Sequence, residues 1–136
     1  MWIFLNDAFL SIVSDKDNPD NLLVRARHHG DIRRVFPRVE VVITPEADYR
    51  YRACLPRTLV AEKIASQIVG IDYTNFKDSV TDESRHIVYF QVWRQMFIWQ
   101  GVMLEMLAAT VPPPVTAKGG EKPRRKRWPL FGGRAE

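Results

Sequence analysis

The stretch YRYRACLPRTLVAEKIASQIVG, residues 49–70, changes its hydrophobic period in the middle. Over residues 49–55 apolar and polar side chains alternate, which is the period-two pattern of a β-strand. Over residues 56–69 apolar residues recur at helical spacing, and Gly70 is a residue that commonly ends a helix. The stretch therefore predicts a strand that leads directly into a helix.

Upstream of this stretch the chain is typical of further strands with one short helix. Residues 2–5 and 8–13 are apolar runs around an Asn-Asp turn signal, which predicts a tight hairpin, with one bent strand as the alternative. Further strands are expected over residues 22–27 and 39–44. A short helix is expected from residue 31 to 36, with Gly30 or Asp31 at its start and Pro37 at its end.

Downstream, the pattern becomes helical. Residues 71–79 have no clean period and are expected to form an ordered loop, and a long helix should begin at Thr81 or Asp82 and run to about Ala109. Strands followed by helices without strict alternation predict an α+β fold. We expect an antiparallel sheet of about five strands, packed on one face by a short and two longer helices. A ferredoxin-like relative is one form of this arrangement.

Charge divides the chain into two parts. The total of 20 Lys and Arg against 16 Asp and Glu gives +4. Residues 111–136 hold 7 basic and 2 acidic side chains, and the remaining 13 basic and 14 acidic side chains leave residues 1–110 at −1. The Pro- and Gly-rich segment lacks periodicity and predicts a disordered basic tail after a single domain of residues 1–110.

Cysteine usage and hydropathy indicate the compartment. The single cysteine, Cys54, excludes an intramolecular disulfide and a zinc site made of cysteines. The N-terminal apolar residues lack a positively charged start and reach Asp7, so we expect no signal peptide. Charged residues interrupt every long apolar run, so we expect no membrane-spanning helix and a cytoplasmic protein.

The expected long helix is unusually apolar, with 15 apolar or aromatic residues among the 21 of residues 87–107. A surface helix needs only an apolar stripe. We expect the first half to lie in the core under the sheet and the second half to form a homo-oligomeric or partner interface. Basic residues are not interleaved on it, so we expect no membrane-surface role. The predicted interface residues are Trp99, Met103, Met106 and Leu107.

Two pairs of arginines are the most informative local feature. Arg25 and Arg27 share one face of a predicted strand, and Arg50 and Arg52 share one face of another, with the neighbouring tyrosines expected on the opposite face. If the strands are neighbours, like charges lie opposite one another, which destabilises a sheet unless acids or an anionic ligand are present. The alternatives are therefore arginines paired with acids on a solvated face, and an anion or nucleic-acid surface.

A second candidate surface is the segment between the two predicted long helices. It combines two aromatic residues with polar residues in a loop, and loops often carry function. The structural alternative is that its aromatic residues close the edge of the core while its Asp and Asn residues shape turns. The candidate residues are Asp72, Tyr73, Asn75, Phe76 and Lys77.

Catalytic features are sparse. Cations near Cys54 could lower its pKa, and His28 or His29 could approach it as a base. The two histidines with Asp31 form no recognised ligand spacing, so we expect no metal. No phosphate-binding loop or nucleophile motif is present, and we expect no enzyme and no cofactor. A small enzyme that uses the histidines with an acid is the alternative.

The C-terminal segment joins a basic run to an aromatic and apolar patch over residues 122–131. Three kinds of contact compete with a purely solubilising role: nucleic-acid phosphates, an anionic membrane surface and a partner groove. The residues expected to make such contacts are Arg124, Arg125, Lys126, Arg127 and Trp128.

Four segments carry a resemblance: LLVRAR (22–27), TPEADYRYR (44–52), IDYTNFK (71–77) and VWRQM (92–96). On these residues the chain resembles a group of small proteins of bacteria and their phages that has no established activity. The likeness covers residues 1–97 and implies a cytoplasmic protein. A phage-related origin would favour an inhibitor of host defence, such as an anti-CRISPR protein.

From the residues themselves we expect a non-enzymatic module that binds a macromolecule. A protein partner or a second copy of the chain is the first expectation. Nucleic-acid binding through the tail and the strand arginines is the alternative.

Overall fold

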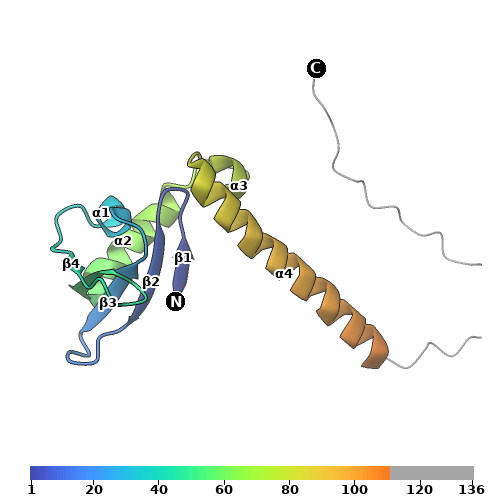
Figure 1. The fold of residues 1–136 in the computed structure, drawn as a ribbon, viewed down its shortest axis with the longest axis horizontal. Coiled ribbons are helices and arrows are strands. Elements are labelled where there is room, and N and C mark those ends of the chain that lie inside the picture. The colour runs from blue at the N-terminus through green and yellow to red at the C-terminus, as the bar shows by residue number, and fades with distance from the viewer. Residues whose placement is uncertain (111–136) are drawn as a thin grey trace, which may run out of the picture. The chain divides into compact units, whose positions relative to one another are not determined.

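The computed structural model describes residues 1–110 and has an α+β fold (Figure 1). The chain divides into two units between Gln100 and Gly101, and all strands of the described residues lie in the first. The elements are β1 (Trp2–Phe4), β2 (Phe9–Ser14), β3 (Asn21–Ala26), α1 (Asp31–Val35), β4 (Val42–Ile43), β5 (Tyr51–Pro56), α2 (Arg57–Val69), α3 (Phe76–Ser79) and α4 (Glu83–Thr110).

The five strands form one open antiparallel sheet in the order β1-β2-β3-β5-β4. The predicted hairpin is confirmed, because β1 pairs with β2 and Phe4 lies opposite Phe9. The expected ferredoxin-like arrangement is wrong, since that fold follows the order β-α-β-β-α-β. Here short connections join the first three strands into a meander, and every strand pair within residues 1–110 is antiparallel, so none requires a crossover helix.

The main core lies on one face of the sheet, against residues of α1 and α2. Alternate residues of the central strands point into it, as the period-two pattern predicts. The strand residues buried there are Leu10, Ile12, Val24, Ala26, Ala53 and Leu55, and the helical segments contribute Ile32, Val35, Phe36 and Val60.

Two elements differ from the sequence expectation. The strand expected over residues 39–44 is shortened to β4, whose two residues are exposed. The residues before it, Val39 and Val41, pack against the core instead of continuing the strand. The expected loop of residues 71–79 contains the four-residue helix α3, whose start is capped by Asn75 Oδ1 accepting from the Lys77 backbone N–H at 3.1 Å. A helix this short leaves no measurable period in the sequence.

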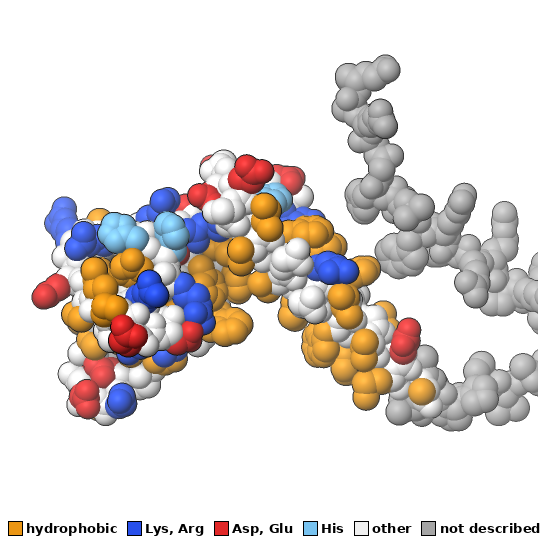
Figure 2. All heavy atoms as spheres, in the orientation of Figure 1, with side chains coloured by type: hydrophobic (Ala, Val, Ile, Leu, Met, Phe, Trp, Pro, Cys, Tyr) orange, Lys and Arg blue, Asp and Glu red, His pale blue; other side chains and the backbone are white. Residues whose placement is uncertain are grey.

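The largest correction concerns α4, whose first half was expected in the core. Tyr89, at 7% exposure, is its only buried side chain among those the structure describes. Apolar side chains gather along the surface of the helix (Figure 2). The core side of the sheet is already occupied by α1 and α2. No helix within residues 1–110 has the length and apolar character that a membrane crossing requires.

Candidate binding surfaces

The structure brings two of the predicted arginines directly together. β3 and β5 are neighbours, and Arg25 lies opposite Arg52 in their register. On its other side Arg25 lies opposite Ser11, and Arg25 Nη2 donates to the buried Ser11 Oγ at 2.9 Å. Neither Arg25 nor Arg52 forms an ion pair with a carboxylate within residues 1–110, and Arg25 Nε is buried with no hydrogen-bond partner there. Two like charges therefore share one row of the sheet without an acid between them.

Tyr49 organises this row, which corrects the expectation that its ring lies on the opposite face. The ring is buried, and the guanidinium carbons of Arg25 and Arg27 lie 4.7 and 4.3 Å from its centroid. Arg52 Nε donates to the Tyr49 carbonyl at 2.9 Å. Because β5 begins only at Tyr51, strand alternation does not extend to Tyr49. Three arginines thus surround one aromatic residue.

The other two predicted arginines differ from this pair. Arg27 forms a two-pronged ion pair with Asp48, at 2.6 and 3.0 Å, and these hydrogen bonds raise the pKa of its guanidinium. Both side chains are more than half exposed, so solvent weakens the pair. Arg50 is exposed and lines a shallow polar hollow beside Arg27 and Asp48. Of the four predicted arginines, Arg27 is therefore paired with an acid and Arg50 is exposed at the polar hollow. Arg25 and Arg52 remain as a pair without an acidic partner within residues 1–110.

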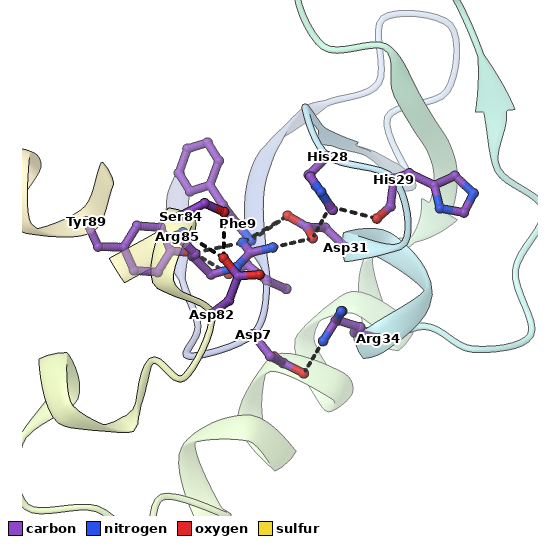
Figure 3. Close-up of polar contacts among 11 residues, drawn as sticks. Asp7, Phe9, His28, His29, Asp31, Arg34, Asp82, Ser84, Arg85 and Tyr89 are labelled. Atoms are coloured by element: carbon purple, nitrogen blue, oxygen red, sulfur yellow. Dashed lines mark hydrogen bonds and ion pairs between the residues drawn. The ribbon is translucent and has the colours of Figure 1, made fainter. Parts of the chain in front are cut away.

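A buried ion pair that sequence reasoning missed anchors the start of α4 (Figure 3). Arg85 Nη2 lies 2.8 Å from Asp31 Oδ1, and Arg85 Nη1 donates to Asp31 Oδ2 at 3.2 Å. Asp31 is 1% exposed and also accepts from the Phe9 backbone N–H at 3.0 Å. Burial lowers the pKa of Arg85, but the hydrogen bonds to Asp31 and Tyr89 outweigh it and raise the pKa.

Tyr89 completes this anchor one turn further along α4. Its hydroxyl donates to the Ala8 carbonyl at 2.9 Å and accepts from Arg85 Nη1 at 3.2 Å. Its ring meets the Phe4 ring edge-on at 5.0 Å. Burial raises the pKa of the phenol. These contacts join α4 to the β1–β2 hairpin.

Glycine at position 30 explains why Asp31 is available to Arg85. Gly30 has φ +89° and occupies the N-cap position of α1, where no side chain caps the helix. Asp31 is the other cap that the sequence predicts, but its carboxylate pairs instead with Arg85, which is 54 positions away in the sequence. Local patterns contain no signal for such a pair.

A groove of about 390 Å³ lies beside this anchor. Side chains of β1, β2 and α4 form its apolar walls, and the ion pair lies at its polar end. The lining residues are Trp2, Phe4, Phe9, Arg27, His28, Asp31, Asp82, Ser84, Arg85, Val88, Tyr89 and Val92.

The segment of residues 72–77 makes structural contacts. Phe76 stacks on Tyr89 with ring centroids 5.8 Å apart, and Tyr73 packs against Phe76 at 6.0 Å. Lys77 Nζ lies 4.3 Å from the centroid of the Trp93 ring. Asn75 caps α3, and Asp72 is exposed. The binding role of this segment stays a prediction, while most of its residues secure α3 and the start of α4.

The features considered for catalysis are separated in the structure. Cys54 is exposed beside Arg52 on β5, but desolvation and a hydrogen bond with Asp15 raise the pKa of its thiol, which is opposite to the expected direction. His28 Nδ1 lies 2.8 Å from the His29 carbonyl and 3.6 Å from Asp31 Oδ1, and the His29 ring packs against Tyr51. Within residues 1–110 no three His, Cys, Asp or Glu side chains gather as a metal site would require.

The predicted interface residues of α4 are exposed, and the exposed apolar surface begins earlier than predicted. Trp99, Met103, Met106 and Leu107 are 37–59% exposed. Upstream, the rings of Phe90, Trp93 and Phe97 stack in sequence, with both centroid distances 5.6 Å. The predicted tail contacts, Arg124, Arg125, Lys126, Arg127 and Trp128, lie outside the described residues.

Comparisons of the chain with protein-family models, with curated proteins and with solved structures found no match.

Proposed function

We propose that the protein is a non-enzymatic binding module that engages a protein partner through the apolar surface of α4. The observation that carries this proposal is the exposure of nine apolar residues within residues 87–99. Each is at least 38% exposed: Ile87, Val88, Phe90, Val92, Trp93, Met96, Phe97, Ile98 and Trp99.

The amount of exposed apolar surface exceeds what a monomer usually tolerates. At half exposure of side chains of about 150 Å², the nine residues present roughly 700 Å² to water. The largest apolar patch of a typical monomeric protein is about 300–600 Å². A surface of this size supports a role in association.

The composition of the surface favours a protein over a membrane or a nucleic acid. Aromatic residues and Met are enriched in the cores of protein interfaces, and four of the nine residues are aromatic. A helix that lies on a membrane surface carries many Lys and Arg residues on its polar face, whereas Arg94 is the only basic residue of this segment. Phosphate contacts would require the same missing charges.

The anchor at the start of α4 gives a second argument for the proposal. Asp31, Arg85 and Tyr89 hold the first turns of α4 through buried hydrogen bonds, so the segment that follows starts from a fixed base. A binding surface gains affinity when its base is ordered before the partner arrives. Inhibition of a host protein, which the resemblance to phage proteins implies, is one form that such binding would take.

Site-specific photo-crosslinking in the native host tests the proposal. A photoreactive phenylalanine analogue at Phe97 should yield a discrete adduct with a protein. The same analogue at Gln91 is the control, because helical geometry of about 100° per residue places Gln91 about 120° around α4 from Phe97, on the side of the polar residues Arg94 and Gln95. If position 97 gives no protein adduct, or no more than position 91, the proposal fails.

A second candidate function is nucleic-acid binding, and the pair Arg25 and Arg52 favours it. Their charges have no acidic partner within residues 1–110, and the exposed Trp2 lies opposite Ser11 in the same row of the sheet. Arginines next to an aromatic ring are typical of single-strand binding surfaces. The affinity of the full chain for single-stranded DNA and RNA, measured against salt, tests this. No binding at about 50 mM salt would remove the candidate, and a shallower salt slope for Arg25→Gln would support it.

A further inference from the structure

We infer that the partner on α4 is a second copy of this chain, which packs its helix against the stacked residues Phe90, Trp93 and Phe97 together with Met96. The inference rests on the proposed function and identifies the protein partner that covers the apolar surface of α4.

The spacing of the stacked residues matches that of helices that pair with one another. Phe90, Trp93 and Phe97 are separated by three and then four positions, which is the spacing of the contact seam in a pair of helices. Their rings already stack along the helix, with interplanar angles of 26° and 16°. A ridge that is ordered before association can insert between the same residues of an identical helix.

The exposed area of the contact surface fits a small, weak interface. At half exposure of side chains of about 150 Å², the four contact residues present roughly 300 Å² per chain, below the roughly 800 Å² per partner of a standard interface and in the range of transient ones. A twofold axis uses the same patch twice, so two copies would cover each other's contact residues.

Charge also permits two copies to meet face to face. The four residues of the contact surface carry no ionisable group. Within residues 1–110 two cations border these residues: the Lys77 ammonium lies over one face of the Trp93 ring, and Arg94 is four positions after Phe90 on the helix. Gln91 and Gln95 fall on the opposite side of α4 at about 100° per residue. The four contact side chains themselves therefore carry no charge that would repel their counterparts in a second copy.

Sedimentation of the full-length chain over a range of concentrations tests the inference. The wild-type chain should reach twice its mass of 15.8 kDa. Phe97→Glu places a charge in the contact and should weaken the dimer at least about 100-fold, because an unpaired charge in an apolar interface is strongly unfavourable. Gln95→Glu adds the same charge on the opposite side of the helix and should leave the dimer intact. Circular dichroism should show the helix content of the wild-type chain in both variants.

The outcomes separate the inference from the proposed function. A wild-type chain that stays monomeric at its highest soluble concentration overturns the inference, and a crosslink from position 97 to a different protein would then leave the proposed function standing. If Phe97→Glu remains dimeric, or Gln95→Glu dissociates equally, the assignment of the contact surface is wrong. A monomer without any crosslink would overturn both.

Discussion

The sheet core and α4 use apolar residues in opposite ways. In the core, side chains such as Leu10, Val24 and Phe36 are at most 2% exposed, and each lies where strand or helix periodicity directs it. In α4, residues of equal hydrophobicity such as Trp93 and Phe97 are 46% and 61% exposed. Composition alone therefore does not decide burial. An apolar helix is buried only if the sheet still has an uncovered apolar face for it, and here α1 and α2 already cover that face.

The largest expected effect comes from the core. Phe36→Ala should lower the free energy of unfolding by about 3–5 kcal/mol, because it removes a large buried ring and leaves a cavity. Chemical denaturation at several protein concentrations measures this, and the loss should be independent of concentration. A loss below about 1 kcal/mol would mean that Phe36 is not in the core that the structure shows.

The anchor of α4 should rank next. Asp31→Ala leaves the mostly buried Arg85 guanidinium without its carboxylate and should cost about 3 kcal/mol. The matched control is Asp48→Ala, which removes the exposed partner of Arg27 and should cost less than about 1 kcal/mol. Equal effects in urea denaturation would show that burial does not distinguish the two pairs.

The Tyr89 hydroxyl should have a smaller effect. Tyr89→Phe keeps the ring packing against Phe4 and Phe76 but removes the hydrogen bond to the Ala8 carbonyl. We expect a loss of about 1–1.5 kcal/mol in the free energy of unfolding. Hydrogen exchange of the β1–β2 turn should increase in the same variant. An unchanged exchange rate would mean that the hydroxyl does not hold the turn.

The start of α4 should be sensitive to acid. Hydrogen bonds from Ser84 and from the Arg85 backbone lower the pKa of Asp82 below its ordinary value of 3.8. Because the folded-state pKa is the lower one, the stabilisation is complete above the ordinary value and is lost as the pH falls through the folded-state pKa. Asp82→Asn can still cap the helix and should weaken this part of the acid dependence. Denaturation midpoints at pH 6 and at about pH 3 compare the two chains.

The smallest effect on the stability of the single chain is expected in the exposed part of α4. In dilute solution Phe97→Ala should change the free energy of unfolding by no more than about 0.5 kcal/mol, as is usual at surface positions. At high concentration the same change should lower the thermal midpoint relative to wild type, because a dimer stabilises the folded state by mass action. If Phe97→Ala lowers the thermal midpoint equally at all protein concentrations, Phe97 packs within a single chain and not in a dimer contact.

Sequence reasoning succeeded where a local period governs the structure. The alternation in residues 22–27 and 49–55 predicted two strands, which the structure places side by side, and the Asp82 cap of α4 was one of two expected starts. It failed where a contact joins distant segments. The pair of Asp31 and Arg85 spans 54 positions, and the position of Tyr49 beneath two arginines depends on where β5 begins.

The exposure of α4 was missed for a related reason. Its composition indicates a core helix, but whether a core has room for another helix depends on how α1 and α2 already cover the sheet. The predicted interface residues began only at Trp99, in the second half of the helix. The stacked rings of Phe90, Trp93 and Phe97 begin nine residues earlier.

The short outer strands have a consequence for aggregation. β1 has three residues and β4 has two, so each edge of the sheet presents few free backbone groups to a further strand. Short edges of this kind hinder the open-ended strand addition that leads to fibres. A chain with so much exposed apolar surface can then associate through a helix, in a contact that closes on itself after two copies, and its sheet stays out of the assembly.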